Sequence, residues 1–203
     1  MISREQIRRA YIDACYQEIE ALKPGNVHRF ADGHRMRAEQ FFESAHVSAD
    51  AVSDPGLSVG QRVLAAVTAT RHKVETNTNL GIVLLCAPLA KAAISGTSDL
   101  QAGLATTLGE LVIDDARHVF SGIVLAQPGG LGSAPKHDVA SKPDVSLLEA
   151  MAAASDRDMI ARQYVTNFAD ILSGGLNAQQ SAIQRNERAM WPTVFVYLYF
   201  LST

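Results

Sequence analysis

The stretch "NLGIVLLCAPLAKAAI", residues 79–94, carries one lysine and almost no other polar side chain. A helix with hydrophobic side chains on every face must be enclosed by other elements of the fold. Pro88 lies inside the stretch and predicts a kink, because proline has no amide N–H to donate within a helix. The stretch therefore predicts a multi-helix bundle with a buried apolar helix at its centre.

The rest of the chain repeats its hydrophobic residues at three- and four-residue steps, which is the period of an amphipathic helix. No alternating strand pattern interrupts it, and the Gly-, Pro- and Ser-rich segment 127–146 predicts a long loop within one domain. We therefore predict an all-α, single-domain bundle over residues 1–203. The first predicted helix ends at Pro24-Gly25. The predicted helices after it cover 36–50, 57–75, 79–94, 98–107, 108–126, 146–173, 178–190 and 192–202.

The composition of the chain limits the kinds of binding partner and the cellular location that we expect. The net charge of −3 gives no reason to expect a nucleic-acid or membrane partner. Cys15 and Cys86, the two cysteines, fall in apolar helical patterns and are predicted to be buried free thiols. The N-terminus lacks the apolar core of a signal peptide, and the apolar C-terminal run is shorter than the roughly 20 residues of a membrane span. We expect a cytoplasmic protein.

Segment 21–37, "ALKPGNVHRFADGHRMR", is rich in cations, and we name it the basic loop. Four cations against one carboxylate give it a formal charge of +3, opposite in sign to the whole chain. Its glycines allow backbone amides to approach a ligand, and clustered cations favour a polyanion such as a phosphate chain. A solvated surface loop is the alternative. The candidate phosphate-binding residues are Lys23, Gly25, Asn26, Arg29 and Arg35.

Glu18 lies on the hydrophobic stripe of the first helix, one turn before Lys23. A carboxylate on a buried face must be paired, bound to a metal or turned toward a cleft. An ordinary ion pair with Lys23 is the alternative to a functional role. His28 and His34, six residues apart in the basic loop, could bind a metal, but they lack the spacing typical of zinc ligands.

The segment "TNTNLG", residues 76–81, precedes the central apolar helix. One polar residue suffices to cap a helix, and this run contains four. The N-terminus of a helix offers unpaired amides and a partial positive charge, so it can bind an anion. Asn77, Thr78 and Gly81 are therefore candidate phosphate-binding residues.

The segment "IDDARHVF", residues 113–120, contains neighbouring carboxylates. Asp115 lies near the hydrophobic stripe of its predicted helix, and Asp114 precedes it. Paired carboxylates near phosphate-binding elements suggest Mg²⁺, which prefers oxygen ligands. Alternatively, one carboxylate is a base and the other pairs with Arg117.

Two further motifs carry polar residues. "PGGLGSAPKHDV" contains glycines that could wrap a phosphate or merely form a turn, followed by His137 and Asp138, which could ligate a metal or orient a substrate. The glycines do not have the spacing of a nucleotide-binding fingerprint. In "SDRDMIARQY", Asp158 and Arg162 are four residues apart, which favours a surface ion pair.

Taken in order, these motifs resemble the triphosphoribosyl-dephospho-CoA synthase family. The resemblance rests on Glu18 before "KPGNVH", "DGHRM", "FFESA", "NTNLG" running into "LLCAPLAKA", "DDA", "PGGLG" with "HDV", and "SDRDMIARQY". These motifs span about residues 14–172. The closest likeness is to a branch whose "KPGNVH" and "PGGLG" elements recur in archaea and methylotrophs. The chain ends earlier than members of the family usually do.

The resemblance implies an all-helical enzyme that takes ATP and 3′-dephospho-CoA, joins the two riboses and releases adenine. Mg²⁺ is the implied cofactor, and a homodimer is compatible with the apolar tail. Breaking the ribose–adenine bond passes through an oxocarbenium-like state, which needs a carboxylate near the sugar, a base and cations on the phosphates. On this hypothesis Glu18 and Asp115 are catalytic, Glu18, Asp114 and Asp115 are metal ligands, and Lys23, Arg29, Arg35 and Arg162 hold phosphates.

The sequence also departs from the pattern of the citrate-lyase-type members. It has "NTNLG" where they have "NTHKG", and Ser-Asp-Arg-Asp at 155–158 where they have Asp-Asp-Thr-Asn. The resemblance therefore implies dephospho-CoA or a related molecule as the acceptor. Two alternatives remain at this stage. One is a helical metal-dependent phosphohydrolase built on His28, His34, His137, Asp138 and Asp158, and the other is a non-catalytic nucleotide-binding relative.

Overall fold

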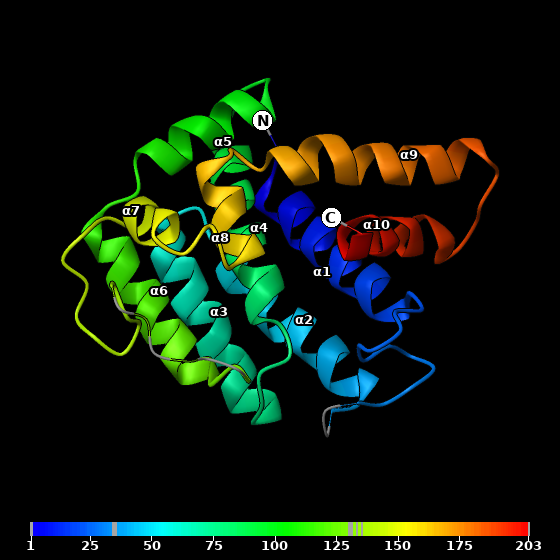
Figure 1. Cartoon of the computed structure of the whole chain (residues 1–203), viewed down its shortest axis with the longest axis horizontal. Coiled ribbons are helices and arrows are strands. Elements are labelled where there is room, and N and C mark those ends of the chain that lie inside the picture. The colour runs from blue at the N-terminus through cyan, green and yellow to red at the C-terminus, as the bar shows by residue number, and fades with distance from the viewer. Residues whose placement is uncertain (1, 34–35, 130–131, 133, 135, 203) are drawn as a thin grey trace.

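Helix α4 (Leu80–Ile94) lies at the centre of the computed structural model, which describes residues 2–33, 36–129, 132, 134 and 136–202 (Figure 1). Helices α1, α2, α3, α5 and α8 all contact it, and none of its residues is exposed. The predicted central apolar helix and the all-α fold are therefore confirmed. The helices before and after it are α1 (Arg4–Glu20), α2 (Ala38–Val52), α3 (Val59–Val74), α5 (Leu100–Gly109) and α6 (Ile113–Ala126).

Helix α4 runs through Pro88 as one α-helix, although proline cannot donate the hydrogen bond that the Leu84 carbonyl would accept. The hydroxyl of Tyr164, on another helix, donates to this carbonyl at 2.7 Å. The Tyr164 side chain is fully buried, so the contact replaces the missing helical bond in the interior.

Helices α1, α2 and α3 form an antiparallel layer. The Tyr11 and Ser48 hydroxyls are 2.8 Å apart, and Arg8 donates to Asp50 at 2.8 Å, so the start of α1 lies beside the end of α2. Lys73 near the end of α3 pairs with Glu43 near the start of α2 at 3.5 Å. The end of α1, the start of α2 and the end of α3 therefore share one end of the bundle.

The opposite end of the bundle is held by the Asp115 carboxylate of α6. It accepts hydrogen bonds from the Ser58 hydroxyl at 2.7 Å and from the amides of Gly60 at 2.8 Å and Val112 at 3.2 Å. One side chain thus satisfies donors at the N-termini of both α3 and α6. Gly60 permits this approach, since a Cβ there would lie 2.5 Å from the Asp115 carbonyl oxygen.

The prediction of one helix over 146–173 is wrong. The structure has α7 (Leu147–Ala152), α8 (Met159–Val165) and a π-helix, η1 (Asp170–Gly175). Asp158 starts α8 by accepting from the Ala161 amide at 2.8 Å, and Asn167 and Phe168 adopt positive φ angles that end the helical path. Helices α9 (Leu176–Gln184) and α10 (Trp191–Ser202) follow.

Helix α10 reaches back to the first part of the chain, where the Tyr197 hydroxyl donates to the Pro24 carbonyl at 2.6 Å. Among the described residues, no helix combines the length and apolarity that crossing a membrane requires. Cys15 and Cys86 are free thiols, as predicted.

Candidate functional site

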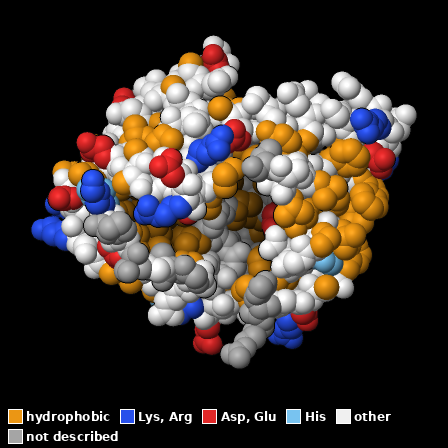
Figure 2. Space-filling model, viewed as in Figure 1, with side chains coloured by type: hydrophobic (Ala, Val, Ile, Leu, Met, Phe, Trp, Pro, Cys, Tyr) orange, Lys and Arg blue, Asp and Glu red, His pale blue; other side chains and the backbone are white. Residues whose placement is uncertain are grey.

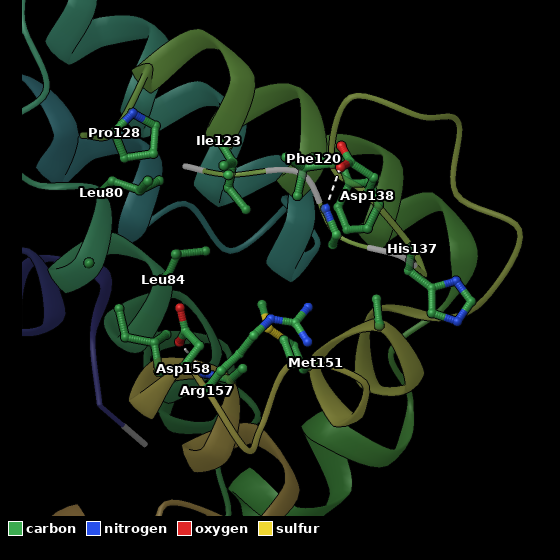
Figure 3. A pocket seen from close by; sticks show the side chains of 18 of the residues that line it. Leu80, Leu84, Phe120, Ile123, Pro128, His137, Asp138, Met151, Arg157 and Asp158 are labelled. Atoms are coloured by element: carbon green, nitrogen blue, oxygen red, sulfur yellow. Dashed lines mark hydrogen bonds between the residues drawn. The ribbon is translucent and has the colours of Figure 1, made fainter. Parts of the chain in front are cut away.

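A cavity of about 610 Å³ opens where the first turn of α4 meets the C-terminal half of α6, the loop after α6, and the facing parts of α7 and α8 (Figure 3). In Figure 2 the molecule is hollowed in the middle of the displayed face, with hydrophobic side chains inside and cations beside the opening. A cavity of this volume encloses most of a drug-sized ligand. Five predicted residues line it: Asn77, Gly81, His137, Asp138 and Asp158.

The inner wall of the cavity is apolar. Leu80 and Leu84 come from α4, Phe120 and Ile123 from α6, and Met151 from α7. These positions face inward because their helices present their hydrophobic stripes to the space between them. The wall therefore suits an uncharged, hydrophobic part of a ligand.

Two exposed cations, Arg157 and Lys136, line the same cavity. Arg157 donates to the Ala153 carbonyl at 3.1 Å, and its guanidinium extends into the opening (Figure 3). Arg157 lies in the motif "SDRDMIARQY", but the spacing in this motif drew attention to Asp158 and Arg162 instead. In the structure the break before α8 turns Arg157 toward the cavity. Exposed cations beside an apolar wall suit a ligand with phosphate groups.

The carboxylates at the cavity are held by backbone amides. Asp138 accepts from the Ala134 amide at 2.7 Å and the Ala140 amide at 2.8 Å, and these two bonds lower the pKa of its carboxyl. Asp158 uses one carboxylate oxygen, Oδ1, to cap α8. Asp138 therefore orders the loop, whereas the second oxygen of Asp158, Oδ2, accepts no hydrogen bond from the described residues.

The polar run before α4 has mainly structural roles. Asn77 accepts from the Leu80 amide at 3.1 Å, the Thr78 and Ser44 hydroxyls are 2.5 Å apart, and Asn79 donates to Ser48 at 3.1 Å. Three of the four polar residues thus bond to α4 itself or to α2. Gly81 lines the cavity from the first turn of α4, where backbone amides have no acceptor within the helix.

Glu18 and Lys23 form an ion pair at the end of α1, as the structural alternative predicted. The Lys23 side chain is only 5% exposed, whereas that of Glu18 is 46% exposed. The buried ammonium fixes one carboxylate oxygen and leaves Glu18 partly open to solvent. The charge of Lys23 is thus already balanced by Glu18, which does not favour the predicted role of Lys23 as a phosphate-binding cation.

The basic loop has its own local structure. Gly25 has a φ of +88°, a conformation that favours glycine, and the Asn26 amide donates to the Lys23 carbonyl at 3.0 Å in the same turn. Arg29 lies 3.5 Å from Glu20 and stacks over the Phe30 ring. His34 and Arg35 lie outside the described residues.

Asp114 and Asp115 are not brought to the cavity. The Asp115 carboxylate is occupied by three donors at the opposite end of the bundle from Glu18, and Asp114 is exposed beside Arg117. This arrangement does not support grouping the two aspartates with Glu18 as metal ligands. Arg162 pairs with Asp170 at 3.2 Å and does not line the cavity.

The histidines also have other partners. The His28 ring accepts from the Phe30 amide at 3.3 Å, and His137 lies 3.3 Å from Asp144 and points away from the cavity in Figure 3. Within residues 2–33, 36–129, 132, 134 and 136–202, no three or more His, Cys, Asp and Glu side chains gather closely enough to hold a metal ion. Nothing in this part of the chain favours the metal-dependent phosphohydrolase.

The described residues thus form an all-helical bundle with an apolar cavity, rimmed by cations, of a size that suits a small-molecule ligand. The sequence model of the family described as "CitG: ATP:dephospho-CoA triphosphoribosyl transferase" matches residues 4–203. The chain belongs to this family of transferases. Comparison with curated proteins finds no match, and comparison with solved structures finds none either.

Proposed function

We propose that this protein transfers the triphosphoribosyl group of ATP to 3′-dephospho-CoA or a close relative of it and releases adenine. Membership of the family supports the substrates. The observation that carries the proposal in this chain is the cavity that Arg157, Lys136 and the first turn of α4 line together with an apolar wall. Phosphates and a hydrophobic group of one ligand can both be satisfied there.

Glu18 is the carboxylate that acts at the reacting ribose. Cleavage of the ribose–adenine bond develops positive charge on the sugar, which a nearby carboxylate stabilises. The buried Lys23 holds one oxygen of Glu18, while the exposed side of the carboxylate remains available. The supporting feature is the contrast in burial between the two partners, since a purely structural pair would not need one open side.

Phosphates are held by the Arg157 guanidinium, the Lys136 ammonium and the amide of Gly81. Mg²⁺ is compatible with this site because it usually binds substrate phosphates and only one or two protein carboxylates. Asp158, with one unoccupied carboxylate oxygen, is the lining residue that fits this role best, since both oxygens of Asp138 are bonded to amides. A bound Mg²⁺ would neutralise phosphate charge.

The direct test is adenine release from ATP by the purified protein, with and without dephospho-CoA. We expect adenine release that depends on the presence of the acceptor.

Arg157→Ala should raise the KM of a phosphate-bearing substrate about tenfold or more, since a charge-assisted contact is lost. Arg162→Ala is the control, because Arg162, in α8, is also an exposed arginine but pairs with Asp170 and does not line the cavity. Equal effects of the two variants, or no adenine release, would overturn the proposal.

A further inference from the structure

We propose that Asn77 donates a hydrogen bond to a phosphate group of the ligand in the cavity, and that Thr78 positions Asn77 by binding to α2. This inference rests on the proposed function, because it adds a residue to the phosphate-binding part of the same site. Asn77 is half-buried and lines the cavity just before the start of α4. Its side chain offers one acceptor oxygen and an NH2 group with two donors.

The two ends of the Asn77 carboxamide have different roles. Only its oxygen can accept a hydrogen bond, so the bond from the Leu80 amide at 3.1 Å fixes Oδ1 at the start of α4. The NH2 group, Nδ2, has no acceptor among the described residues. Because the oxygen is held by the helix, the carboxamide is already oriented and both of its N–H bonds remain for a ligand. A donor that is ordered in advance loses little conformational entropy when the ligand binds.

The next side chain in the segment binds to α2 instead. The Thr78 hydroxyl lies 2.5 Å from that of Ser44, which is fully buried. Ser44 donates its single proton to the Gln40 carbonyl at 2.5 Å, so Thr78 is the donor in their contact. Helix α2 itself contributes no described residue to the cavity. Thr78 therefore ties the segment to the bundle, and the adjacent Asn77 is held at the cavity.

A phosphate group is the acceptor that fits the surroundings of Asn77. Arg157 and Lys136 line the same cavity, both are exposed, and neither forms an ion pair with a described residue. A phosphate group has several oxygens, so it can accept from these cations and from the Asn77 amide together. Hydrogen bonds to an ionised acceptor are also stronger than those to a neutral one. We therefore infer that Asn77 adds a directional donor to a site whose charge comes from Arg157 and Lys136.

Asn77→Ser tests the donor, because serine keeps an oxygen that can cap α4 but is shorter and has no NH2 group. Asn77→Asp also keeps the capping oxygen and places a negative charge beside the ligand. Calorimetric binding of inorganic triphosphate, a probe made of phosphate groups alone, should weaken about fivefold or more with Asn77→Ser and further with Asn77→Asp. The midpoint of thermal unfolding should stay close to that of the wild type in both variants. Triphosphate binding that Asn77→Ser leaves unchanged, or a wild-type protein that does not bind the probe, would overturn the inference.

Thr78→Val tests the positioning role, since valine keeps the shape of threonine without its hydroxyl and leaves the bond of Ser44 within α2 intact. Thr68→Val is the matched control, because the half-buried Thr68 hydroxyl donates only within its own helix, at 2.7 Å. We expect Thr78→Val to weaken triphosphate binding about threefold, and Thr68→Val and the hydroxyl-retaining Thr78→Ser to leave it unchanged. In the Asn77→Ser background Thr78→Val should have no further effect. Equal losses in both backgrounds would overturn the positioning role.

Adenine release separates this inference from the proposed function. Weaker triphosphate binding by Asn77→Ser, in a protein that does not release adenine, would overturn the proposed function and leave the inference standing. Adenine release by a protein whose triphosphate binding is insensitive to Asn77→Ser would do the reverse. In an active protein, the KM values for ATP and for dephospho-CoA identify the source of the phosphate, because Asn77→Ser raises the KM of the substrate that supplies it. Two unchanged KM values would overturn the inference.

Discussion

The Tyr164 hydroxyl donates to the Leu84 carbonyl at 2.7 Å, in the one turn of α4 where Pro88 cannot donate. A helix from the later part of the chain thereby completes the backbone bonding of the central helix. The same turn of α4 forms part of the cavity wall through Leu84. The hydrogen bond between Tyr164 and Leu84 therefore stabilises the core and also holds one part of the cavity wall in place.

Tyr164→Phe should lower the free energy of unfolding by about 1–3 kcal/mol, because it leaves a buried carbonyl without a partner. The variant Pro88→Ala restores an amide N–H, so Tyr164→Phe should cost less in that background. Urea unfolding of the four proteins in this double-mutant cycle measures the coupling. An equal loss in both backgrounds would show that Tyr164 stabilises the fold by packing alone.

Asp115→Ala should destabilise the protein without removing its chemistry. Three donors at the N-termini of α3 and α6 lose their acceptor, which we expect to cost about 2 kcal/mol or more. Thermal unfolding and kcat at a temperature well below the midpoint measure the two effects separately. If kcat fell by orders of magnitude while the midpoint stayed constant, Asp115 would be the catalytic residue that the sequence suggested.

Glu18→Gln should reduce kcat for adenine release by about a hundredfold or more, because an uncharged side chain cannot stabilise the developing positive charge. The substitution should lower the free energy of unfolding only slightly, since the amide oxygen of the glutamine can still accept from Lys23. Glu20→Gln is the control, as Glu20 is equally exposed and pairs with Arg29 at 3.5 Å. Full activity of Glu18→Gln would remove Glu18 from the mechanism.

The two thiols should be unreactive at neutral pH. Burial raises the pKa of both Cys15 and Cys86 from 9.0 to about 12. Alkylation by iodoacetamide at pH 8 should therefore be slow for the folded protein and fast in denaturant, with mass spectrometry as the readout. Because the unfolded thiols ionise near pH 9 and the folded ones near 12, stability should fall as the pH rises between these values. Fast alkylation of the folded protein would contradict this burial.

The helices were predictable because hydrophobic periodicity and a fully apolar centre leave few other ways to bury the chain. The breaks around α8 were not, since they depend on the Asp158 cap and on positive φ angles at Asn167 and Phe168. Without these breaks, Arg157 could not be placed at the cavity.

Part of the candidate site was also predictable from the sequence. Asn77, Gly81 and Asp158 were selected as helix-terminal or motif residues, and the fold brings them to one cavity. Asp115 was selected in the same way, as a polar residue in a motif, but its carboxylate binds the N-termini of two helices. A sequence shows that a buried carboxylate needs partners, whereas only the packing shows whether those partners belong to the protein or to a ligand.

Val27 of the basic loop packs with Ile19 of α1 and Ala38 of α2 in a small hydrophobic cluster that is separate from the main core. Segments with separate cores can open in separate cooperative steps. We therefore expect the region around Glu18 and the cavity to differ in their local opening equilibria, and substrates that touch both would couple them. Amide exchange in residues 21–33 should then slow when ATP and the acceptor are bound together, by more than either ligand achieves alone.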